Sequence, residues 1–348
     1  MNTLIYKILK HLLKPLKDYL VSEHFPASIA KSASNPSLYT DIFKTPPYGI
    51  KEKSDLELHM LVGEKDFLRS FWSLKSFYYY SGLPARLVIQ DDGSLSSDSI
   101  NRYYEHFPGC IVNTNNDEPI YTGLKNHPMC QFFYEYHVIA KKLFPPLLVT
   151  QANYVVIMDS DILWFKRSRA ITDCIRSGIP FCLNSGSKAY VRNQEFMENK
   201  LELYPANNVN SGIIGYRKSD FLDLNFIEAA IGKLVHVSKD LIRESAGYLD
   251  SSVNIEAEDI NQTVCWWVME QTIYALLLGR NPHHHSLKAC STRISDQLFG
   301  SLHQFTKSPI MKGTALIHFI SDQRHNQFFP VGVEHLIKRG FLNKYAYE

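Results

Sequence analysis

Residues 153–165 read NYVVIMDSDILWF, and the rest of this 348-residue chain can be placed around them. An unbroken apolar run that leads into two carboxylates is typical of a strand buried on both faces of a sheet. Because residues two apart in a strand point to the same side, Asp159 and Asp161 can aim at one point. Carboxylates that close repel each other unless a cation lies between them, and hard oxygen ligands favour Mg²⁺ or Mn²⁺. The alternative is a solvated turn without a metal.

The composition is that of an ordinary globular protein. Hydrophobic residues make up 45% of the chain and charged residues 21%, which allows a sizeable core in one large domain with appended elements. The 37 basic and 35 acidic residues give a net charge of +2, so a nucleic-acid partner held by bulk charge is not expected. The six cysteines show no C-x-x-C spacing, which favours reduced thiols and a cytoplasmic protein over a zinc site or a disulfide framework.

Residues 1–21 predict a basic amphipathic helix, because apolar side chains recur at helical spacing between lysines. The lysines interrupt the apolar run too often for a transmembrane helix, and no cleavage site of a secretory signal follows. Two interpretations stay open. Residues 1–20 could contact an anionic membrane, which would make the protein peripheral at the inner face of that membrane, or they could pack on protein. Residues 22–54, rich in Ser, Pro and Lys, indicate a connecting segment.

An order of strand, helix and strand begins near residue 55 and predicts an α/β fold. Residues 56–63 indicate a first strand, which is followed by a helix that ends at Gly82 and by a second strand at 86–90. The residues at the ends of these two strands are Val62, Gly63, Asp91 and Asp92. Glycine lets a backbone approach a ligand closely, whereas Asp-Asp-Gly-Ser after the second strand could equally be a plain turn.

Three later segments carry polar residues beside apolar ones. A helix is expected from Pro128 to Leu143, stopped by the two prolines that follow, and Lys142 lies near its end. Asn-Ser-Gly at 210–212 predicts a polar turn that enters an apolar strand, and a short apolar strand near the end of the chain carries His318. Each has a plain structural alternative: a solvated helix end, an ordinary turn and a histidine satisfied in the core.

The segment Val-Ile-Met-Asp-Ser-Asp at 156–161 resembles the Asp-x-Asp motif of nucleotide-sugar glycosyltransferases with the GT-A fold. The chain looks most like the retaining family of glycogenin and bacterial lipopolysaccharide galactosyltransferases, over roughly residues 55–325. The resemblance implies one GT-A domain over 55–348, with a Rossmann-like mixed sheet flanked by helices. Its nucleotide-binding half would be about 55–165 and its acceptor and sugar half about 166–348. It also implies a Mn²⁺ or Mg²⁺ ion that bridges the two phosphates of the donor.

The resemblance implies roles for single residues. The metal ligands would be Asp159, Asp161 and His318. The residues with a catalytic role would be Glu270, Gln271 and Asn210, because the acidic-Gln pair faces the sugar beside the anomeric carbon and the Asn-Ser-Gly segment lines the sugar pocket. The donor contacts would be Val62, Gly63, Asp91, Asp92, Lys142, Ser160, Ser211, Gly212 and Arg324. After its histidine the family continues with Gly, Lys and Pro-Trp, whereas this chain reads Ser-Asp-Gln-Arg-His at 321–325, so Arg324 or His325 would replace the lysine.

The sequence therefore predicts an enzyme, a metal-dependent glycosyltransferase. It would move a sugar from a nucleotide-diphosphate sugar, with UDP as the favoured nucleotide, to an acceptor hydroxyl in glycan or surface polysaccharide synthesis. Retention of configuration is favoured over inversion by the resemblance alone. One alternative is a sugar nucleotidyltransferase, for which the segment Val-Gly-Glu-Lys at 62–65 is a poor phosphate loop. Another is a non-catalytic protein that binds carbohydrate or a membrane surface on the same fold.

Overall fold

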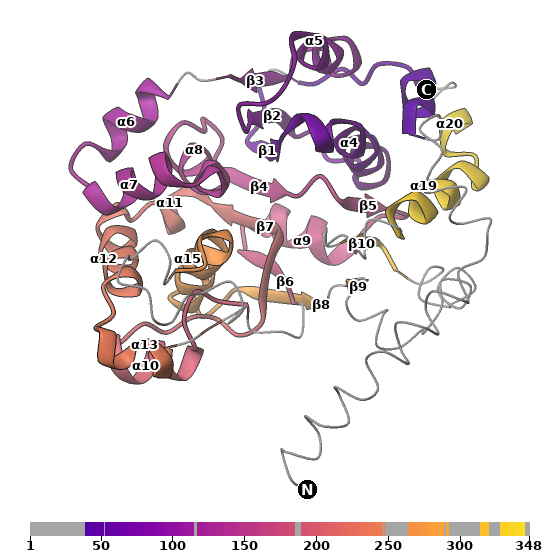
Figure 1. Cartoon of the computed structure of the whole chain (residues 1–348). Helices are drawn as coiled ribbons and strands as arrows, with labels where there is room; N and C mark the ends of the chain where they lie inside the picture. The colour runs from indigo at the N-terminus through magenta and orange to yellow at the C-terminus, as the bar shows by residue number, and fades with distance from the viewer. Residues whose placement is uncertain are drawn as a thin grey trace, which may run out of the picture.

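This computed structural model of the chain describes residues 39–51, 53–114, 117–184, 189–245, 247, 264–288, 290–291, 314–319 and 328–344 (Figure 1). The helix expected at 1–21, most of the connecting segment 22–54 and Arg324 lie outside these residues. Within the part that is described, no helix is both long and apolar enough to cross a membrane.

A mixed seven-stranded sheet forms the centre of the molecule, in the order β3-β2-β1-β4-β7-β6-β8 (Figure 1). Its strands are β1 (Leu56–Val62), β2 (Arg86–Asp91), β3 (Ile111–Asn113), β4 (Tyr154–Met158), β6 (Phe181–Asn184), β7 (Val209–Arg217) and β8 (His285–Lys288). The strands from β3 to β4 are parallel, whereas β7 runs antiparallel to both β4 and β6. The carboxyl ends of β1, β2 and β4 therefore meet at one edge of the sheet. The expected α/β fold with a mixed sheet is confirmed.

A second sheet of three short strands follows the Asp-x-Asp segment, in the order β5-β10-β9. The strands are β5 (Ile162–Trp164), β10 (Leu316–His318) and β9 (Cys290–Ser291). Strand β10 pairs antiparallel with β5, so that His318 lies opposite Ile162. This pairing joins segments that are more than a hundred residues apart in the sequence and brings the histidine next to the aspartates.

The helices cover both faces of the central sheet. The α-helices are α4 (Phe67–Ser81), α5 (Ser97–His106), α6 (Glu118–Leu124), α7 (Pro128–Tyr136), α8 (Phe144–Leu148), α9 (Arg169–Ser177), α10 (Gln194–Lys200), α11 (Lys218–Phe221), α12 (Leu224–Val235), α13 (Ile242–Ser245), α15 (Met269–Gly279), α19 (Phe328–Lys338) and α20 (Phe341–Lys344). The 3₁₀ helices are η1 (Asp41–Lys44), η2 (Glu64–Asp66), η3 (Val138–Lys142), η4 (Lys239–Leu241) and η6 (Trp266–Val268). Gly82 ends α4 in the left-handed conformation with φ 61°, which glycine adopts without strain.

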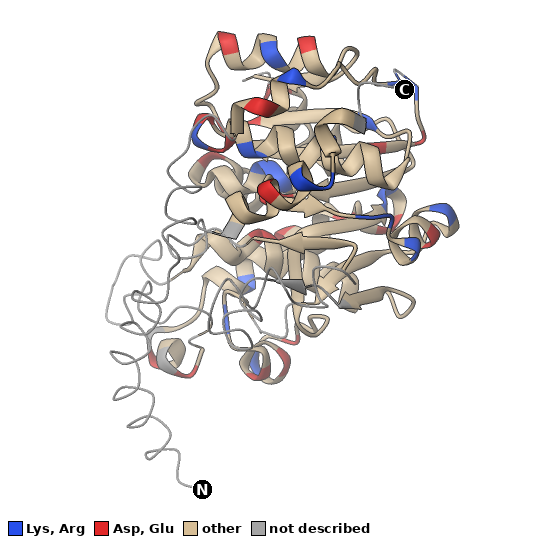
Figure 2. Cartoon of the chain, turned by 90° about the vertical axis from the view of Figure 1, so that its right-hand side faces the viewer, with Lys and Arg blue, Asp and Glu red and all other residues tan. Residues whose placement is uncertain are grey.

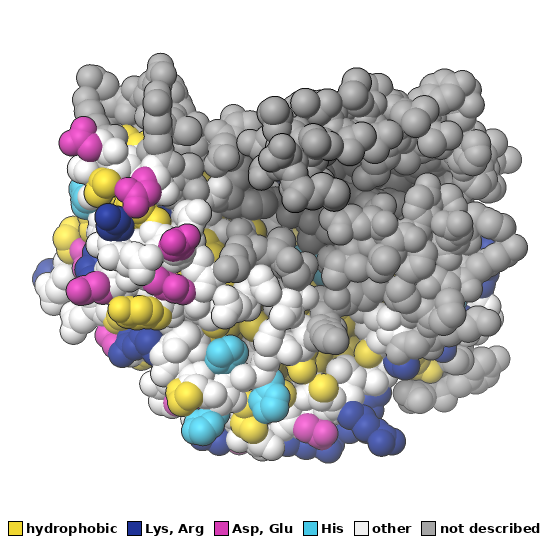
Figure 3. Space-filling model, turned by 90° about the horizontal axis from the view of Figure 1, so that it is seen from below, with side chains coloured by type: hydrophobic (Ala, Val, Ile, Leu, Met, Phe, Trp, Pro, Cys, Tyr) yellow, Lys and Arg dark blue, Asp and Glu magenta, His cyan; other side chains and the backbone are white. Residues whose placement is uncertain are grey.

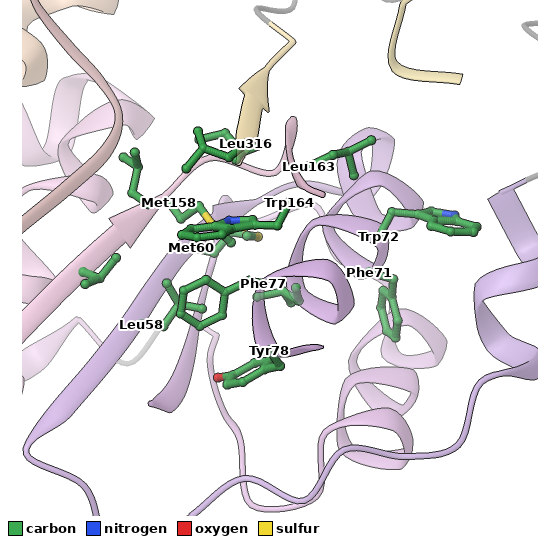
Figure 4. Close-up of a cluster of buried hydrophobic side chains, with 14 of the residues drawn as sticks. Leu58, Met60, Phe71, Trp72, Phe77, Tyr78, Met158, Leu163, Trp164 and Leu316 are labelled. Atoms are coloured by element: carbon green, nitrogen blue, oxygen red, sulfur yellow. The ribbon is translucent and has the colours of Figure 1, made fainter. Parts of the chain in front are cut away.

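Two hydrophobic cores lie on opposite faces of β4. Val156 and Met158 pack in the core under α4, whereas Val155 and Ile157 pack in the core with α7, α12 and α15. Figure 4 shows the first core, where the Trp164 ring packs edge-on against Phe77 of α4 at a centroid distance of 5.4 Å. The strand is thus buried on both faces, as the unbroken apolar run predicts.

The helix expected from Pro128 to Leu143 is wrong, because the chain leaves the helical conformation at His137 (φ −140°, ψ 125°). The His137 side chain accepts a hydrogen bond from the Ile139 backbone N–H and so starts η3. The two prolines do not stop a helix either. They occupy the first turn of α8, where a missing N–H costs nothing.

The surface carries charges of both signs. Figure 2 shows Lys and Arg interspersed with Asp and Glu over the described helices, in keeping with the net charge of +2. On the face drawn in Figure 3, hydrophobic, basic, acidic and histidine side chains are mixed. Because no sign of charge dominates these faces, we expect the charges that bear on function to lie at the edge of the sheet.

Candidate metal and donor site

The two aspartates lie in the short connection between the central sheet and the small sheet. Asp159 directly follows β4, and its backbone N–H donates to Gly212 O of the neighbouring strand β7 at 2.8 Å. Asp161 directly precedes β5, and its backbone O accepts the Phe319 N–H of the β10 segment at 2.8 Å. Helix α4 supports the same connection, because Ser73 Oγ donates to Asp159 O at 3.3 Å. Five elements, β4, β5, β7, β10 and α4, therefore fix the positions of the two carboxylates.

His318 completes a cluster of three potential metal ligands. One ligand atom from each of Asp159, Asp161 and His318 lies within 4.8 Å of the others, and this is the only such group among the described residues. His318 Nε2 lies 3.2 Å from Asp161 Oδ1 and 3.6 Å from Asp159 Oδ2. The side chains of His318 and Asp161 are buried, whereas that of Asp159 is 29% exposed. A cation held here would be open to a ligand on the Asp159 side.

The hydrogen bonds of the cluster orient electron-rich atoms toward the place that a cation would occupy. Asn210 Oδ1 accepts the Gly212 N–H at 2.9 Å, which identifies this atom as the amide oxygen. The same oxygen lies 2.9 Å from His318 Nδ1, so the ring must donate there. In the neutral ring, the lone pair of Nε2 then faces carboxylate oxygens, of which Asp161 Oδ1 is buried and accepts no hydrogen bond from the described residues. Electron-rich atoms that face one another in a buried place indicate a bound cation.

Electrostatics points the same way. Burial alone would lower the pKa of His318, but the carboxylates of Asp161 and Asp159 outweigh burial and raise it. Without a cation, the charges favour a proton on the ring; a divalent cation in the same place would replace that proton. Two carboxylates and one imidazole are ligands that Mn²⁺ accepts.

A buried lysine lies beside the cluster. Lys142, the last residue of η3, is 5% exposed, and its Nζ lies 2.6 Å from Asp159 Oδ1 and 3.3 Å from Glu270 Oε1. The same Nζ donates to Ser211 O at 3.4 Å. Lys142 is thus a buried partner of two carboxylates, and not a solvated helix end.

The lysine and the glutamate differ in their pKa shifts. Burial would lower the pKa of Lys142, but Asp159 and Glu270 outweigh it and raise the pKa, so the lysine stays charged. Burial raises the pKa of Glu270 to about 7 although Lys142 opposes the shift. The raised pKa of Lys142 indicates a strong ion pair with Glu270, whereas the raised pKa of Glu270 indicates a weak one. Because Lys142 lies closer to Asp159, we assign the firm ion pair to those two residues and treat Glu270 as the group that can change its charge near neutral pH.

Strand β7 connects the metal cluster to the first turn of α15. Ser211 Oγ donates to Glu270 Oε2 at 3.0 Å, and the Ser211 N–H donates to Gln271 Oε1 at 3.0 Å. Gln271 Nε2 in turn donates to Ala189 O at 2.6 Å. A Cβ added at Gly212 would overlap the His318 ring, so only glycine fits at this point of the strand.

Asn-Ser-Gly at 210–212 does not form the turn that the sequence predicts. All three residues lie inside β7, which begins at Val209. Strand β6 pairs with Asn210 through Leu183, and the register shift between Cys182 and Leu183 leaves residues 211–213 as a bulge of β7. The position of Ser211 between Glu270 and Gln271 was not predicted, because strand pairing and not local sequence creates it.

The ends of β1 and β2, where the sequence predicts donor contacts, lie side by side. The Asp92 N–H donates to Val62 O at 3.0 Å, and a Cβ added at Gly63 would overlap the Asp92 carboxylate. The two aspartates also shape their own turn. Asp91 Oδ1 accepts hydrogen bonds from the backbone N–H groups of Gly93 and Leu95, and Asp92 Oδ1 accepts hydrogen bonds from the backbone N–H and the hydroxyl of Ser94. Both the plain turn and the close approach of backbone are therefore present.

Lys141 is a further basic residue at this edge that the sequence analysis did not single out. Its Nζ donates to Asp91 O at 3.0 Å and so connects η3 to the end of β2. Ser160 lies between the two aspartates and is partly exposed. Arg324 is outside the described residues, so its predicted role stays a prediction.

The sequence matches no family model and no curated protein. Among solved structures, mouse xyloside xylosyltransferase 1 in its apo form is 10% identical, with 80% of this chain and 99% of that chain covered and a TM-score of 0.44. The bifunctional glycosyltransferase WbbM is 12% identical over 83% of this chain and about half, 51%, of that chain, with a TM-score of 0.46. The galactosyltransferase LgtC with donor and acceptor sugar analogs is 8% identical over 81% and 95%, with a TM-score of 0.42. Likenesses this distant carry no argument on function, which rests on the site itself.

Proposed function

We propose that the chain is a metal-dependent glycosyltransferase that moves a sugar from a nucleotide-diphosphate sugar to an acceptor hydroxyl. One observation carries the proposal. Asp159, Asp161 and His318 converge at the carboxyl edge of the sheet, and the buried Lys142 and Glu270 join them through one hydrogen-bonded network. A divalent cation and a lysine side by side match the two phosphates of a donor, and the carboxyl edge of an α/β sheet is where such ligands bind.

The residues divide the work of the reaction. A Mn²⁺ or Mg²⁺ ion held by the cluster would neutralise the charge that develops on the leaving diphosphate. Lys142 adds a second positive charge beside the same phosphates, and the ends of β1 and β2 with Gly63 and Asp92 bind the nucleoside of the donor, for which we favour uridine and hence a UDP-sugar. The backbone near Ser211 and Gly212 lines the sugar. For Arg324, which is not among the described residues, the proposed role is that of a ligand of the diphosphate.

We favour retention of configuration over inversion. An inverting reaction needs a general base that touches the acceptor hydroxyl. Glu270 is 1% exposed and is held by Ser211 and Lys142, so it is poorly placed to take that proton. A buried carboxylate beside the sugar instead stabilises positive charge at the anomeric carbon, with Gln271 and Asn210 orienting the ring.

We also propose that residues 1–20 bring the enzyme to the inner face of a membrane. Their lysines alternate with an apolar stripe, which suits an anionic lipid surface. Sedimentation of the full chain with vesicles of neutral or anionic lipid tests this. Equal recovery of the protein with both vesicle types would contradict it.

The first test of the enzyme is calorimetric titration of UDP into the protein with Mn²⁺ and then with EDTA. We expect UDP binding that needs the metal and that disappears in Asp161→Ala. The matched control is Asp173→Ala, which removes an exposed aspartate of α9 away from the site and should leave binding unchanged. UDP binding that survives EDTA would contradict the metal assignment. Binding of UTP without UDP would favour a sugar nucleotidyltransferase instead.

A further inference from the structure

A pocket opens beside η3 and α15, the helices that carry Lys142 and Glu270. Its volume is about 350 Å³, within the roughly 300–1,000 Å³ of small-molecule sites. The residues that line it are Tyr136, His137, Val264, Cys265, Trp266 and Trp267. None of them is Lys, Arg, Asp or Glu. Among the described residues of the pocket, a phosphate or a charged peptide therefore finds no ionic partner, whereas a neutral ligand does not need one.

The pocket is connected to the proposed reaction site through two short helices. His137 directly precedes η3, which ends at Lys142, and Trp267 belongs to η6, which runs into α15 with Glu270 in its first turn. At a rise of about 2 Å per residue in a 3₁₀ helix and about 1.5 Å in an α-helix, the pocket is on the order of 5–10 Å from the Lys142–Glu270 pair. A molecule with one end at the reaction site can reach it.

Aromatic side chains are exposed in this pocket. Trp267 is 63% exposed and Tyr136 is 45% exposed, and they are two of only six large hydrophobic residues that are exposed in the described part of the chain. The His137 ring meets Trp267 edge-on, with ring centroids 4.6 Å apart and an interplanar angle of 87°. The indole is thus supported by a neighbour while much of its surface stays in water, which is unfavourable unless a ligand covers it.

The pocket also offers a neutral hydrogen-bond donor. His137 Nδ1 accepts the Ile139 N–H at 3.3 Å, so the proton of the neutral ring is on Nε2. Burial lowers the pKa of His137, which keeps the ring neutral at pH 7. Trp266 lines the same pocket with its ring, whereas its indole N–H is buried, so His137 is the donor that the proposal uses. A flat apolar face with a neutral donor beside it matches a sugar ring, which has C–H groups on its faces and hydroxyls at its rim.

We propose that this pocket is the acceptor subsite and that it binds a neutral carbohydrate, with a sugar ring stacked on Trp267 and a hydroxyl that accepts a hydrogen bond from His137 Nε2. The inference rests on the proposed glycosyltransferase and specifies the class of its acceptor. The unit bound on Trp267 is the one next to the hydroxyl that receives the transferred sugar. The reaction itself is unchanged: the acceptor oxygen forms the new glycosidic bond, the donor loses its nucleoside diphosphate, and the hydroxyl proton leaves with that product.

Saturation-transfer NMR on the full chain with UDP and Mg²⁺ tests the subsite. The probes are methyl β-glucoside, methyl β-galactoside, methyl α-mannoside, lactose, maltose and n-octyl β-glucoside below its micellar concentration. We expect ring protons of at least one probe to be saturated, and its affinity to fall about fivefold or more in Trp267→Ala while Trp267→Phe keeps most of it. The matched control is Tyr204→Ala, since Tyr204 is 64% exposed and its backbone O lies beside Gly279 at the far end of α15.

The result of each measurement either supports or contradicts the acceptor subsite. The subsite is overturned if no probe binds, if Trp267→Ala binds as the unchanged protein does, if Tyr204→Ala loses as much, or if saturation is confined to the octyl chain. A measurement on the unchanged protein covers the case in which Trp267→Ala does not fold: a bound probe should protect tryptophan fluorescence from iodide, and unaltered quenching would contradict stacking. UDP titration of the same samples separates the two proposals. Absence of UDP binding to the unchanged protein would contradict the proposed glycosyltransferase. Glycoside binding tests the acceptor subsite independently of that result.

Discussion

Gly212→Ala is the substitution that tests the site most directly. A Cβ at this position would overlap the His318 ring and would lie 2.8 Å from Asn210 Oδ1. The new methyl group therefore pushes apart the two groups whose 2.9 Å hydrogen bond sets the tautomer of the metal-binding ring. The strand itself has no freedom to move away, because the Asp159 N–H is bonded to Gly212 O.

Two effects of known size follow from this overlap. Insertion of a methyl group into a close-packed place costs about 1–3 kcal/mol of stability. Loss of the group that orients a histidine ligand lowers metal affinity by about 10–100-fold. We expect both in Gly212→Ala, measured as a lower free energy of unfolding in urea and as weaker Mn²⁺ binding by calorimetry.

Gly215→Ala is the matched control for this prediction. A Cβ at Gly215, three residues along the same strand, would overlap the Phe181 ring and so imposes a similar steric cost away from the metal ligands. It should lose stability and keep its Mn²⁺ affinity. If Gly212→Ala binds Mn²⁺ as tightly as the unchanged protein, or if Gly215→Ala loses as much affinity, the reasoning that His318 is oriented through β7 is refuted.

Two further predictions concern buried lysines. Lys142→Ala removes the cation beside Asp159 and Glu270 and should cost about 3–5 kcal/mol in urea unfolding, of which Glu270→Gln in the same protein should recover a part; no recovery would show that Glu270 does not contribute to the cost. Burial lowers the pKa of Lys75 from its ordinary value of 10.5 to about 7, so between these pH values the unfolded chain holds a proton that the folded chain does not. Stability should therefore rise with pH over this window by up to about 1.4 kcal/mol per pH unit relative to Lys75→Met, and parallel pH profiles of the two proteins would contradict the burial argument.

The features that depend on neighbouring residues could be predicted from the sequence. Val155 to Met158 alternate between two cores because an apolar strand in a central position has no polar face, and the Asp-x-Asp spacing alone puts both carboxylates on one side. The helix broken at His137 could not be predicted from periodicity. Its apolar spacing continues across the break, and only a hydrogen bond from the backbone to the imidazole decides that the chain turns there.

The features that depend on pairing between distant strands could not be predicted from the residues themselves. His318 reaches the aspartates only because β10 pairs antiparallel with β5, and the resemblance to a family was needed to single it out. Ser211 is similar: its sequence neighbours suggest a turn, but β7 carries it between β4 and α15, where it bonds Glu270 and Gln271. A serine in a strand carries no local signal of such a role, since the signal is the set of partners that the sheet brings to it.

The charges of the finished site explain why it calls for a divalent cation and not for a second lysine. Asp159, Asp161 and Glu270 place three carboxylates around the one ammonium group of Lys142, which leaves an excess of two negative charges, or of one when Glu270 is protonated. His318, whose Nδ1 proton is committed to the amide oxygen of Asn210, offers a neutral nitrogen once a metal has replaced the proton on Nε2, and it then adds no positive charge. A cation of charge +2 balances the ionised cluster, and a diphosphate that arrives afterwards would meet a metal and a lysine instead of exposed carboxylates. The carboxylates on their own would repel the donor that the site is proposed to bind, so the metal has to bind before the donor or together with it.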